Sequence, residues 1–181
     1  MVPIELRSER LLLSVPTPDD VDAITEYCQD PLFERYLTTP WPYRPSDAEW
    51  FVGTFVPRGW ADESEFTWAI RSIETEQLLG VIGWRSRGDV GFWMGAPHRG
   101  QGYMTEALAT VVEWVFVDRG AEQIEWESVV GNLGSARVAR AVGFEFTGIG
   151  PSLLPVRDAS EAWHGVLTRS DDREVKSGWP L

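Results

Sequence analysis

The stretch Ala96–Phe116, APHRGQGYMTEALATVVEWVF, places a basic pair and two glycines directly before a run with apolar residues at helical spacing. That spacing predicts an amphipathic helix that begins near Met104. The first turn of a helix presents backbone N–H groups without partners and a partial positive charge. Glycines let a ligand approach this backbone, and Arg99 adds a full charge. The stretch therefore predicts a loop that binds a phosphate-bearing cofactor.

Three classes of cofactor compete for this loop. A nucleoside-triphosphate loop needs a Gly-Lys-Ser/Thr sequence, which the chain lacks. A dinucleotide site needs G-x-G-x-x-G in an early strand–helix–strand unit, whereas Gly95, Gly100 and Gly102 lie past mid-chain with a different spacing. The pyrophosphate of coenzyme A is the third candidate.

The composition limits the other function classes. The chain has 181 residues, enough for a single domain over residues 1–181. Its formal net charge of -12 argues against nucleic acid and allows a cationic partner. The one cysteine, Cys28, excludes a disulfide framework or a thiolate zinc cluster, and no metal is expected. The apolar runs are too short for a signal peptide or a membrane span, which predicts a cytoplasmic protein without a membrane partner.

Helices and strands alternate in an order typical of one layered α+β or mixed α/β domain. The predicted helices span residues 17–30, 46–56, 104–119 and 135–143. The predicted strands span residues 11–15, 66–71, 78–85, 90–95, 123–130, 144–150 and 161–168. A capping box from Ser46 to Glu49 is expected to open the second helix, and the proline-rich stretch Thr38–Pro45 is expected to be a loop.

The loop resembles a known family signature. RGQGYM, from Arg99 to Met104, is similar to the Q/R-x-x-G-x-G/A signature of the GNAT superfamily of acetyl-CoA-dependent N-acetyltransferases. Arg99 and Gly102 match the signature, whereas Met104 departs from the usual small residue, which implies different packing beside the pyrophosphate.

A second element supports the same family. GNLGSARVARAVGF resembles the N-x-x-S…GF element of the RimJ/RimL-type branch, which acetylates ribosomal-protein N-termini. Asn132, Ser135, Gly143 and Phe144 carry this resemblance. Together the two elements make the likeness specific, and it extends over nearly the whole chain.

The resemblance implies a GNAT fold: a mixed, mostly antiparallel central sheet with splayed middle strands and helices on both faces. The pantetheine arm of acetyl-CoA would enter the gap and pair with the first splayed strand, while loop amides bind the pyrophosphate. Arg137 or Arg140 would reach the adenosine phosphate. The cofactor residues implied are Trp93, Met94, Gly95, Arg99, Gly100, Gln101, Gly102, Tyr103, Met104, Asn132 and Arg137.

Acetyl transfer to an amine needs a proton acceptor, donors for the oxyanion and a donor for the departing thiolate. Relatives often carry a tyrosine four residues after the Ser135 position, but this chain has Ala139 there, so Ser135 is the predicted donor to sulfur. A helix cap is the structural alternative for Ser135. Glu127 is the candidate base, with a solvated strand face as its alternative. Strand amides near Met94 are expected to bind the oxyanion.

The acceptor side is less specified. Trp41, Tyr43 and Trp84 are candidates for the wall of the acceptor cleft, with core packing as the alternative for each. The acceptor is expected to be a primary amine, on a peptide N-terminus or a small molecule, and a homodimer is compatible with the sequence. Two alternatives stay open: a GNAT fold that binds CoA as a sensor or scaffold without turnover, and a nucleotide-binding protein of another fold.

Overall fold

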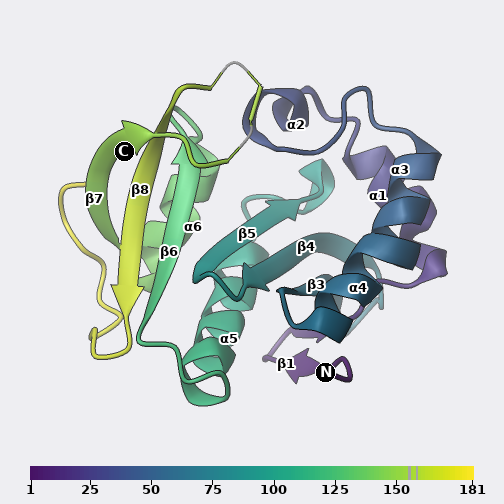
Figure 1. Ribbon diagram of the computed structural model, residues 1–181, viewed down its shortest axis with the longest axis horizontal. Coiled ribbons are helices and arrows are strands. Elements are labelled where there is room, and N and C mark those ends of the chain that lie inside the picture. Colours follow the sequence, from purple (N-terminus) through teal and green to yellow (C-terminus); the bar gives the residue numbers. More distant parts are fainter. Residues whose placement is uncertain (155, 158) are drawn as a thin grey trace.

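The computed structural model describes residues 1–154, 156–157 and 159–181. In this described part, eight strands form one open sheet in the order β1-β2-β3-β4-β5-β6-β8-β7 (Figure 1). Their bounds are β1 (Leu6–Arg7), β2 (Leu11–Ser14), β3 (Glu65–Ser72), β4 (Leu78–Arg85), β5 (Asp89–Met94), β6 (Gln123–Val129), β7 (Glu145–Pro151) and β8 (Glu161–Thr168). Neighbouring strands are antiparallel except β5 and β6, which are parallel. The predicted mixed, mostly antiparallel sheet is confirmed.

Helices cover both faces of this sheet (Figure 1). Their bounds are α1 (Val21–Tyr27), α2 (Pro31–Tyr36), α3 (Pro45–Trp50), α4 (Val56–Asp62), α5 (Tyr103–Val117) and α6 (Leu133–Val142). Two 3-10 turns (Pro18–Asp20 and Ala96–His98) and a π turn (Phe51–Phe55) complete the helical segments of the described chain. One hydrophobic core lies between the sheet and α5 and α6, and a second lies between the other face and α1 and α3.

The helix predicted from the opening stretch forms as expected. Every residue of its predicted apolar stripe is buried against the sheet: Met104, Ala107, Leu108, Val111, Val112 and Val115. The α5 helix is also the connection that carries the chain from β5 to the parallel strand β6 (Figure 1).

Two helix starts differ from prediction. The second predicted helix begins at Pro45, and Asp47 accepts a hydrogen bond from the backbone N–H of Arg44 (2.8 Å), so the Ser46–Glu49 capping box was wrong. Proline suits the first helical position because its φ is already fixed and it lacks the N–H that would stay unpaired there. The same rule explains why Pro31, the residue after the predicted helix 17–30, opens the short helix α2, which the sequence did not predict.

The middle of the sheet opens into a gap. Strands β5 and β6 pair only at Asp89 with Glu125 and at Val90 with Trp126, and they separate beyond these positions. The predicted splayed strands are therefore present, and β5 from Gly91 onward has an edge that no strand covers within the described residues.

Candidate functional site

The loop before α5 offers a row of unpaired amides. Gly100 and Gly102 have positive φ (75° and 80°), a conformation that glycine adopts without strain. The first backbone hydrogen bond of α5 runs from Glu106 N–H to the Gly102 carbonyl (3.1 Å). Within the described chain, the amides of residues 100–104 donate no hydrogen bond. The loop can therefore bind an anion with several consecutive N–H groups.

A basic residue directly before β2 contacts this loop. Arg10 donates from Nη1 to the Gln101 carbonyl (3.1 Å) and from Nε to Glu106 (2.7 Å), and its guanidinium lies 4.7 Å from the centre of the Tyr103 ring. Glu106 also accepts from Ser8 Oγ (2.6 Å) and Arg10 N–H (2.8 Å). Burial opposes the ionisation of Glu106, but these hydrogen bonds outweigh it and lower its pKa. Arg10 thus fixes the carbonyl of Gln101, a predicted cofactor residue that does not line the cleft described below.

The residue before the loop is fixed by packing. A Cβ at Gly95 would lie 2.9 Å from the Tyr27 ring, so the close approach requires glycine. Tyr27 Oη hydrogen-bonds His98 Nε2 (2.9 Å) and donates to the Leu78 carbonyl (3.2 Å). Burial raises the pKa of Tyr27 and lowers that of His98. Gly95 therefore serves this packing in the structure and does not line the cleft described next.

A cleft of about 630 Å³, here called the loop cleft, lies between the Gly100–Met104 loop, α2 and the start of α6. The structure brings most of the predicted cofactor residues into its lining: Trp93, Met94, Arg99, Gly100, Gly102, Tyr103, Met104, Asn132 and Arg137. Arg140, the alternative to Arg137, instead donates to the Lys176 carbonyl (3.4 Å) and is outside the lining.

Arg99 has a partner that the sequence did not indicate. Its Nη1 binds Asp30 (2.6 Å), and its Nε donates to the Met94 carbonyl (3.0 Å). Asp30 also caps α2 by accepting from Leu32 N–H (2.9 Å). Arg99 thus joins the loop to α2, and a direct contact between its remaining donors and a phosphate stays a prediction.

The free edge of β5 presents amides to the gap. Gly95 N–H bonds the Leu79 carbonyl on the β4 side (2.9 Å). Because backbone groups alternate in direction along a strand, the amides of Phe92 and Met94 face the opposite side, toward the gap. They are the donors that an extended ligand in the gap would meet.

Ser135 lies at the far side of the gap, on the first turn of α6. Asn132 caps this helix by accepting from Ser135 N–H (3.2 Å), so the cap is Asn132 and not Ser135. Ser135 Oγ accepts from Trp126 Nε1 (3.0 Å), which leaves the hydroxyl hydrogen for another acceptor. Trp126 was not identified from the sequence, because nothing in its local pattern distinguishes it from a core tryptophan.

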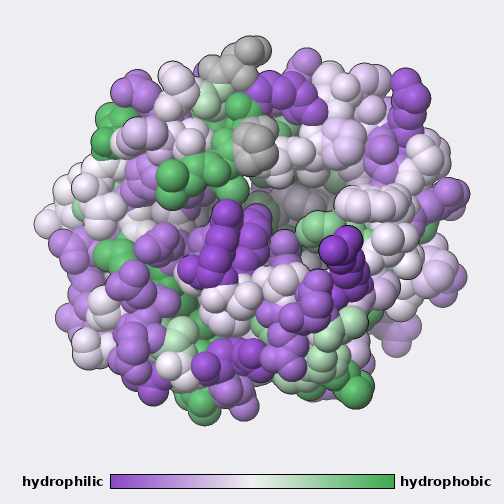
Figure 2. All heavy atoms as spheres, viewed as in Figure 1, coloured by the Kyte–Doolittle hydropathy of each residue, from purple (hydrophilic) through white to green (hydrophobic). Residues whose placement is uncertain are grey.

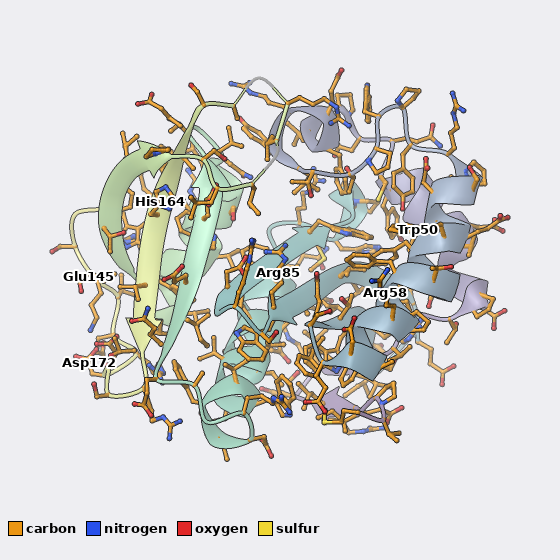
Figure 3. All side chains as sticks on the ribbon, in the orientation of Figure 1. Trp50, Arg58, Arg85, Glu145, His164 and Asp172 are labelled. Carbon is orange, nitrogen blue, oxygen red and sulfur yellow. The ribbon has the colours of Figure 1, made fainter. Side chains whose placement is uncertain are left out.

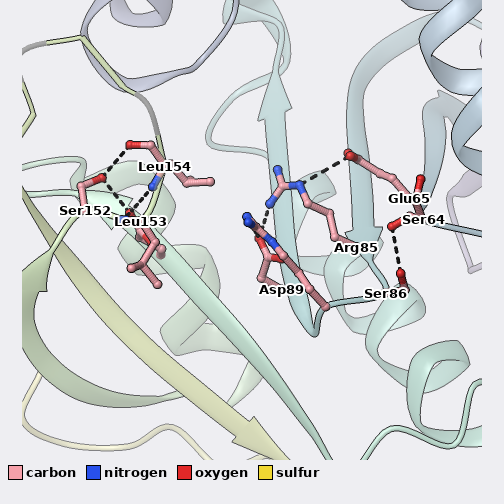
Figure 4. A network of polar contacts seen from close by, with 10 residues as sticks. Ser64, Glu65, Arg85, Ser86, Asp89, Ser152, Leu153 and Leu154 are labelled. Carbon is pink, nitrogen blue, oxygen red and sulfur yellow. Dashed lines mark hydrogen bonds and ion pairs between the residues drawn. The ribbon is translucent and has the colours of Figure 1, made fainter.

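A second cleft of about 770 Å³, here called the sheet cleft, lies over β3, β4 and β5 on the face opposite α5. Figure 2 shows hydrophilic side chains gathered at the centre of this face beside a hollow. Glu127 lines the cleft and accepts at Oε1 from Ser152 Oγ (2.8 Å), Leu153 N–H (2.9 Å) and Leu154 N–H (3.3 Å), a cluster shown in Figure 4. These three donors fix the position of Oε1 at the wall of the cleft.

The three predicted acceptor residues separate. Tyr43 lines the sheet cleft, and burial raises the pKa of its hydroxyl. Trp84 is a correction: it is 5% exposed and stacks on Phe66 in the core beneath the sheet, because it alternates with the cleft-facing residues of β4. Trp41 packs at the edge of the second core and lines neither cleft.

The two clefts share a border. Six residues line both of them: Tyr36, Leu37, Phe92, Trp93, Asn132 and Ser135. The α2 helix crosses the gap at this border, because Tyr36 Oη donates to the Gly131 carbonyl beyond β6 (3.2 Å) and Asp30 binds the loop after β5. A molecule in one cleft would therefore contact a molecule in the other.

The described residues give little support for thiol or metal chemistry. Cys28 is buried, and burial raises the pKa of its thiol to about 12, which makes it a poor nucleophile. The described residues contain no cluster of three metal-ligating side chains. None of the described helices has the length and apolarity needed to cross a bilayer.

Comparison with known proteins identifies the family. The model of the acetyltransferase (GNAT) domain matches residues 10–145, which is most of the chain. The chain belongs to the GNAT acetyltransferase family. It is accordingly an acyltransferase that depends on acetyl-CoA, as its resemblance predicted.

Two relatives from Bacillus species are named as N-acetyltransferases. The GNAT chain is 24% identical over 153 residues to "Uncharacterized N-acetyltransferase p20" of Bacillus licheniformis, covering 80% of this chain and 84% of the relative. It is 30% identical over 112 residues to "Probable N-acetyltransferase YjcK" of Bacillus subtilis, covering 58% and 61%.

Solved structures share the fold and include the predicted branch. A RimL ribosomal L7/L12 alpha-N-protein acetyltransferase in complex with coenzyme A has a TM-score of 0.80 at 15% identity, covering 91% of this chain and 98% of that one. Mycobacterium smegmatis RimJ in complex with CoA-disulfide has a TM-score of 0.76 at 18% identity, covering 92% and 87%. The self-immunity acetyltransferase MccE, with acetyl-CoA and AMP, has a TM-score of 0.76 at 17% identity, covering 89% and 93%.

Proposed function

We propose that the protein transfers the acetyl group of acetyl-CoA to a primary amine by direct attack, without a covalent enzyme intermediate. The border between the two clefts carries this proposal, because six residues line both. A thioester that enters through the loop cleft and an amine that enters through the sheet cleft would meet there. Holding two reactants in contact makes their reaction effectively unimolecular.

Acetyl-CoA occupies the loop cleft in this proposal. The amides of Gly100–Met104 bind the pyrophosphate, since a helix start with unpaired N–H groups favours an anion. The pantetheine arm runs along β5 past the amides of Phe92 and Met94, and Arg137 reaches the adenosine phosphate. The CoA and acetyl-CoA complexes of structural neighbours support this choice of cofactor.

The residues at the border supply the chemistry. The amine nitrogen bonds to the acetyl carbon, the C–S bond breaks, and the sulfur leaves as a thiolate. The Met94 amide donates to the oxyanion, and the Ser135 hydroxyl donates its hydrogen to sulfur while Trp126 holds its oxygen. Glu127, or water bound to it, takes the proton of the amine.

The domain organisation, the cellular location and the partners follow from the same proposal. We infer a single catalytic domain that works in the cytoplasm on a free amine of a peptide or small molecule, with neither nucleic acid nor membrane as partner. A homodimer stays a prediction.

The test has two measurements. Calorimetric titration with CoA should give binding heat, and acetyl-CoA with a panel of primary amines should release thiol only when an amine is present. Binding without release for every amine would instead support a CoA sensor or scaffold. Absence of CoA binding would overturn both.

A further inference from the structure

The segment after β8, residues 169–181, turns back beside β7 (Figure 1). In Figure 3 Asp172 of this segment lies at the same edge of the molecule as Glu145, the first residue of β7. Arg173 packs closely on Gly143, the residue that ends α6, because a Cβ at Gly143 would lie 2.8 Å from the Arg173 Cα. The 169–181 segment is therefore anchored against the end of α6.

Trp179 is the residue by which this segment joins the hydrophobic core. The centre of its ring lies 5.3 Å from that of Trp126 and 5.4 Å from that of Phe146. Its Nε1 donates to the Phe144 carbonyl (3.3 Å), which holds the indole in one orientation. Aromatic pairs at such distances add stabilisation beyond the area that they bury. Trp179 therefore forms a fixed wall against the Trp126 ring.

The space for this wall exists because the neighbouring strand has a glycine. Cross-strand pairing places Gly165 of β8 opposite Trp126 of β6. A Cβ at Gly165 would lie 3.3 Å from Cε3 of Trp126 and 3.6 Å from Cη2 of Trp179, so the two rings meet over a position without a side chain. On the other side, Trp126 pairs with Val90 of β5 where the two strands begin to separate. Trp179 thus supplies the packing beside Trp126 that Gly165 does not.

Trp126 links this packing to the proposed point of transfer. It is 1% exposed, and its Nε1 donates to Ser135 Oγ (3.0 Å). A serine hydroxyl rotates to suit its partners, so a donor that holds the oxygen limits where the hydrogen can point. An indole is one rigid unit, and a movement of its six-membered part over Gly165 also moves Nε1. The orientation of the Ser135 hydroxyl therefore depends on the packing against the Trp126 ring.

We propose that Trp179 is a positioning residue for acetyl transfer. It holds the Trp126 ring, the Trp126 N–H holds the Ser135 oxygen, and the Ser135 hydrogen is thereby directed to the departing sulfur. Trp179 touches neither reactant, since it lines neither cleft. The inference rests on the proposed function and adds to it a residue from outside both clefts.

A double-mutant cycle tests this series of contacts. Trp179→Ala should lower the rate of single-turnover thiol release by about two- to tenfold, the effect of one lost aromatic pair, with CoA affinity unchanged. Trp179→Phe keeps a ring against Trp126 and should restore most of the rate. In a Ser135→Ala background, Trp179→Ala should cause no further loss, because the group that it positions is gone.

Ile4→Ala is the matched control for lost packing. Ile4 is a partly buried apolar residue on the same core, and its carbonyl accepts from Trp68 on β3 (2.9 Å), on the other side of the sheet from β6 and β8. This variant should lower the melting temperature but keep the rate of thiol release. An equal loss from Trp179→Ala in both backgrounds, or no loss in the native background, would overturn the proposal.

Hydrogen exchange of the Trp126 indole N–H gives a readout that needs no turnover. Its NMR signal is assigned by its absence in Trp126→Phe. Trp179→Ala should speed this exchange several-fold, as Ser135→Ala should, because a hydrogen-bonded N–H exchanges when its bond opens, whereas Ile4→Ala should not. If no amine releases thiol, the proposed transfer fails and the exchange alone decides. An unchanged exchange rate in Trp179→Ala would then reject the positioning role.

Discussion

The loop cleft and the sheet cleft meet at six residues, but they are built in different ways. The proposed anion-binding part of the loop cleft is a contiguous run, Gly100–Met104, whose backbone amides have no partner in the described chain. The sheet cleft takes its side chains from β3, β4, β5, β6, α3, the π turn after α3, the start of α6 and the segments after α2 and β7. Its charged groups, such as Glu65, Arg85 and Glu127, come from distant parts of the chain.

The difference indicates which part of the protein determines cofactor binding and which part determines acceptor selection. A shared cofactor can be bound by backbone groups, so its site depends on a short glycine-containing motif and tolerates change elsewhere. An acceptor is distinguished by side chains, and their positions depend on strand register. Substitutions should therefore separate cofactor binding from acceptor selection, except at the border, where both are affected.

Ser135→Ala should have the largest effect, because it removes the proposed donor to the leaving sulfur at the border. We expect kcat to fall by roughly 10- to 100-fold, corresponding to the 1.5–3 kcal/mol of a charged hydrogen bond, with CoA affinity little changed. Single-turnover thiol release and CoA calorimetry measure the two quantities. Ser46→Ala on exposed α3 is the control. Unchanged kcat in the Ser135 variant would exclude it as the donor.

Gly100→Ala should weaken binding in the loop cleft and leave the sheet cleft unchanged. Gly100 and Gly120 have similar positive φ (75° and 69°), so alanine introduces similar backbone strain of about 1–2 kcal/mol at each. Only the Gly100 change should weaken CoA, by roughly 5- to 30-fold, measured by calorimetry. Equal CoA affinities in the two variants would show that the loop conformation does not govern binding.

Arg10→Met should give a smaller version of the same loss. The variant removes the hydrogen bond to the Gln101 carbonyl and the pairing with Glu106, but no atom that lines the loop cleft. CoA affinity should fall about fivefold, close to 1 kcal/mol, while the preference among acceptors stays native. Arg58→Met, at a highly exposed arginine on α4, controls for the lost charge. A changed acceptor preference would contradict the separation of the clefts.

Glu65→Gln should have the smallest effect of these variants. It uses the pH dependence of stability to test how the sheet cleft affects the Glu65 carboxylate. Burial raises the pKa of Glu65 above its usual 4.5, so the folded protein binds more protons than the unfolded chain above that pH. This carboxyl therefore destabilises the native protein as pH rises past 4.5. The Tm of the variant minus the Tm of the native protein should rise by about 2 °C from pH 4 to pH 7, as measured by thermal melting. A relative loss over that range would indicate that Arg85 outweighs burial.

Local patterns predicted the sheet strands and α5 well, because period-two and period-3.6 spacing depends only on neighbouring residues. They failed where two prolines opened helices, at Pro31 and Pro45, since the same residue also fits a loop. They also misplaced Trp84, whose apolar run is buried on both faces and gives no sign of which side faces the cleft.

The sequence by itself determined the family and the loop for which we propose phosphate binding, because the glycines, the arginine and the following helix are adjacent in the chain. Only the tertiary structure decided that Arg99 pairs with Asp30, that Trp126 holds Ser135, and that Trp179 packs on Trp126. Those contacts join residues whose spacing along the chain carries no signal, since the docking of α2, of α6 and of the segment after β8 brings them together.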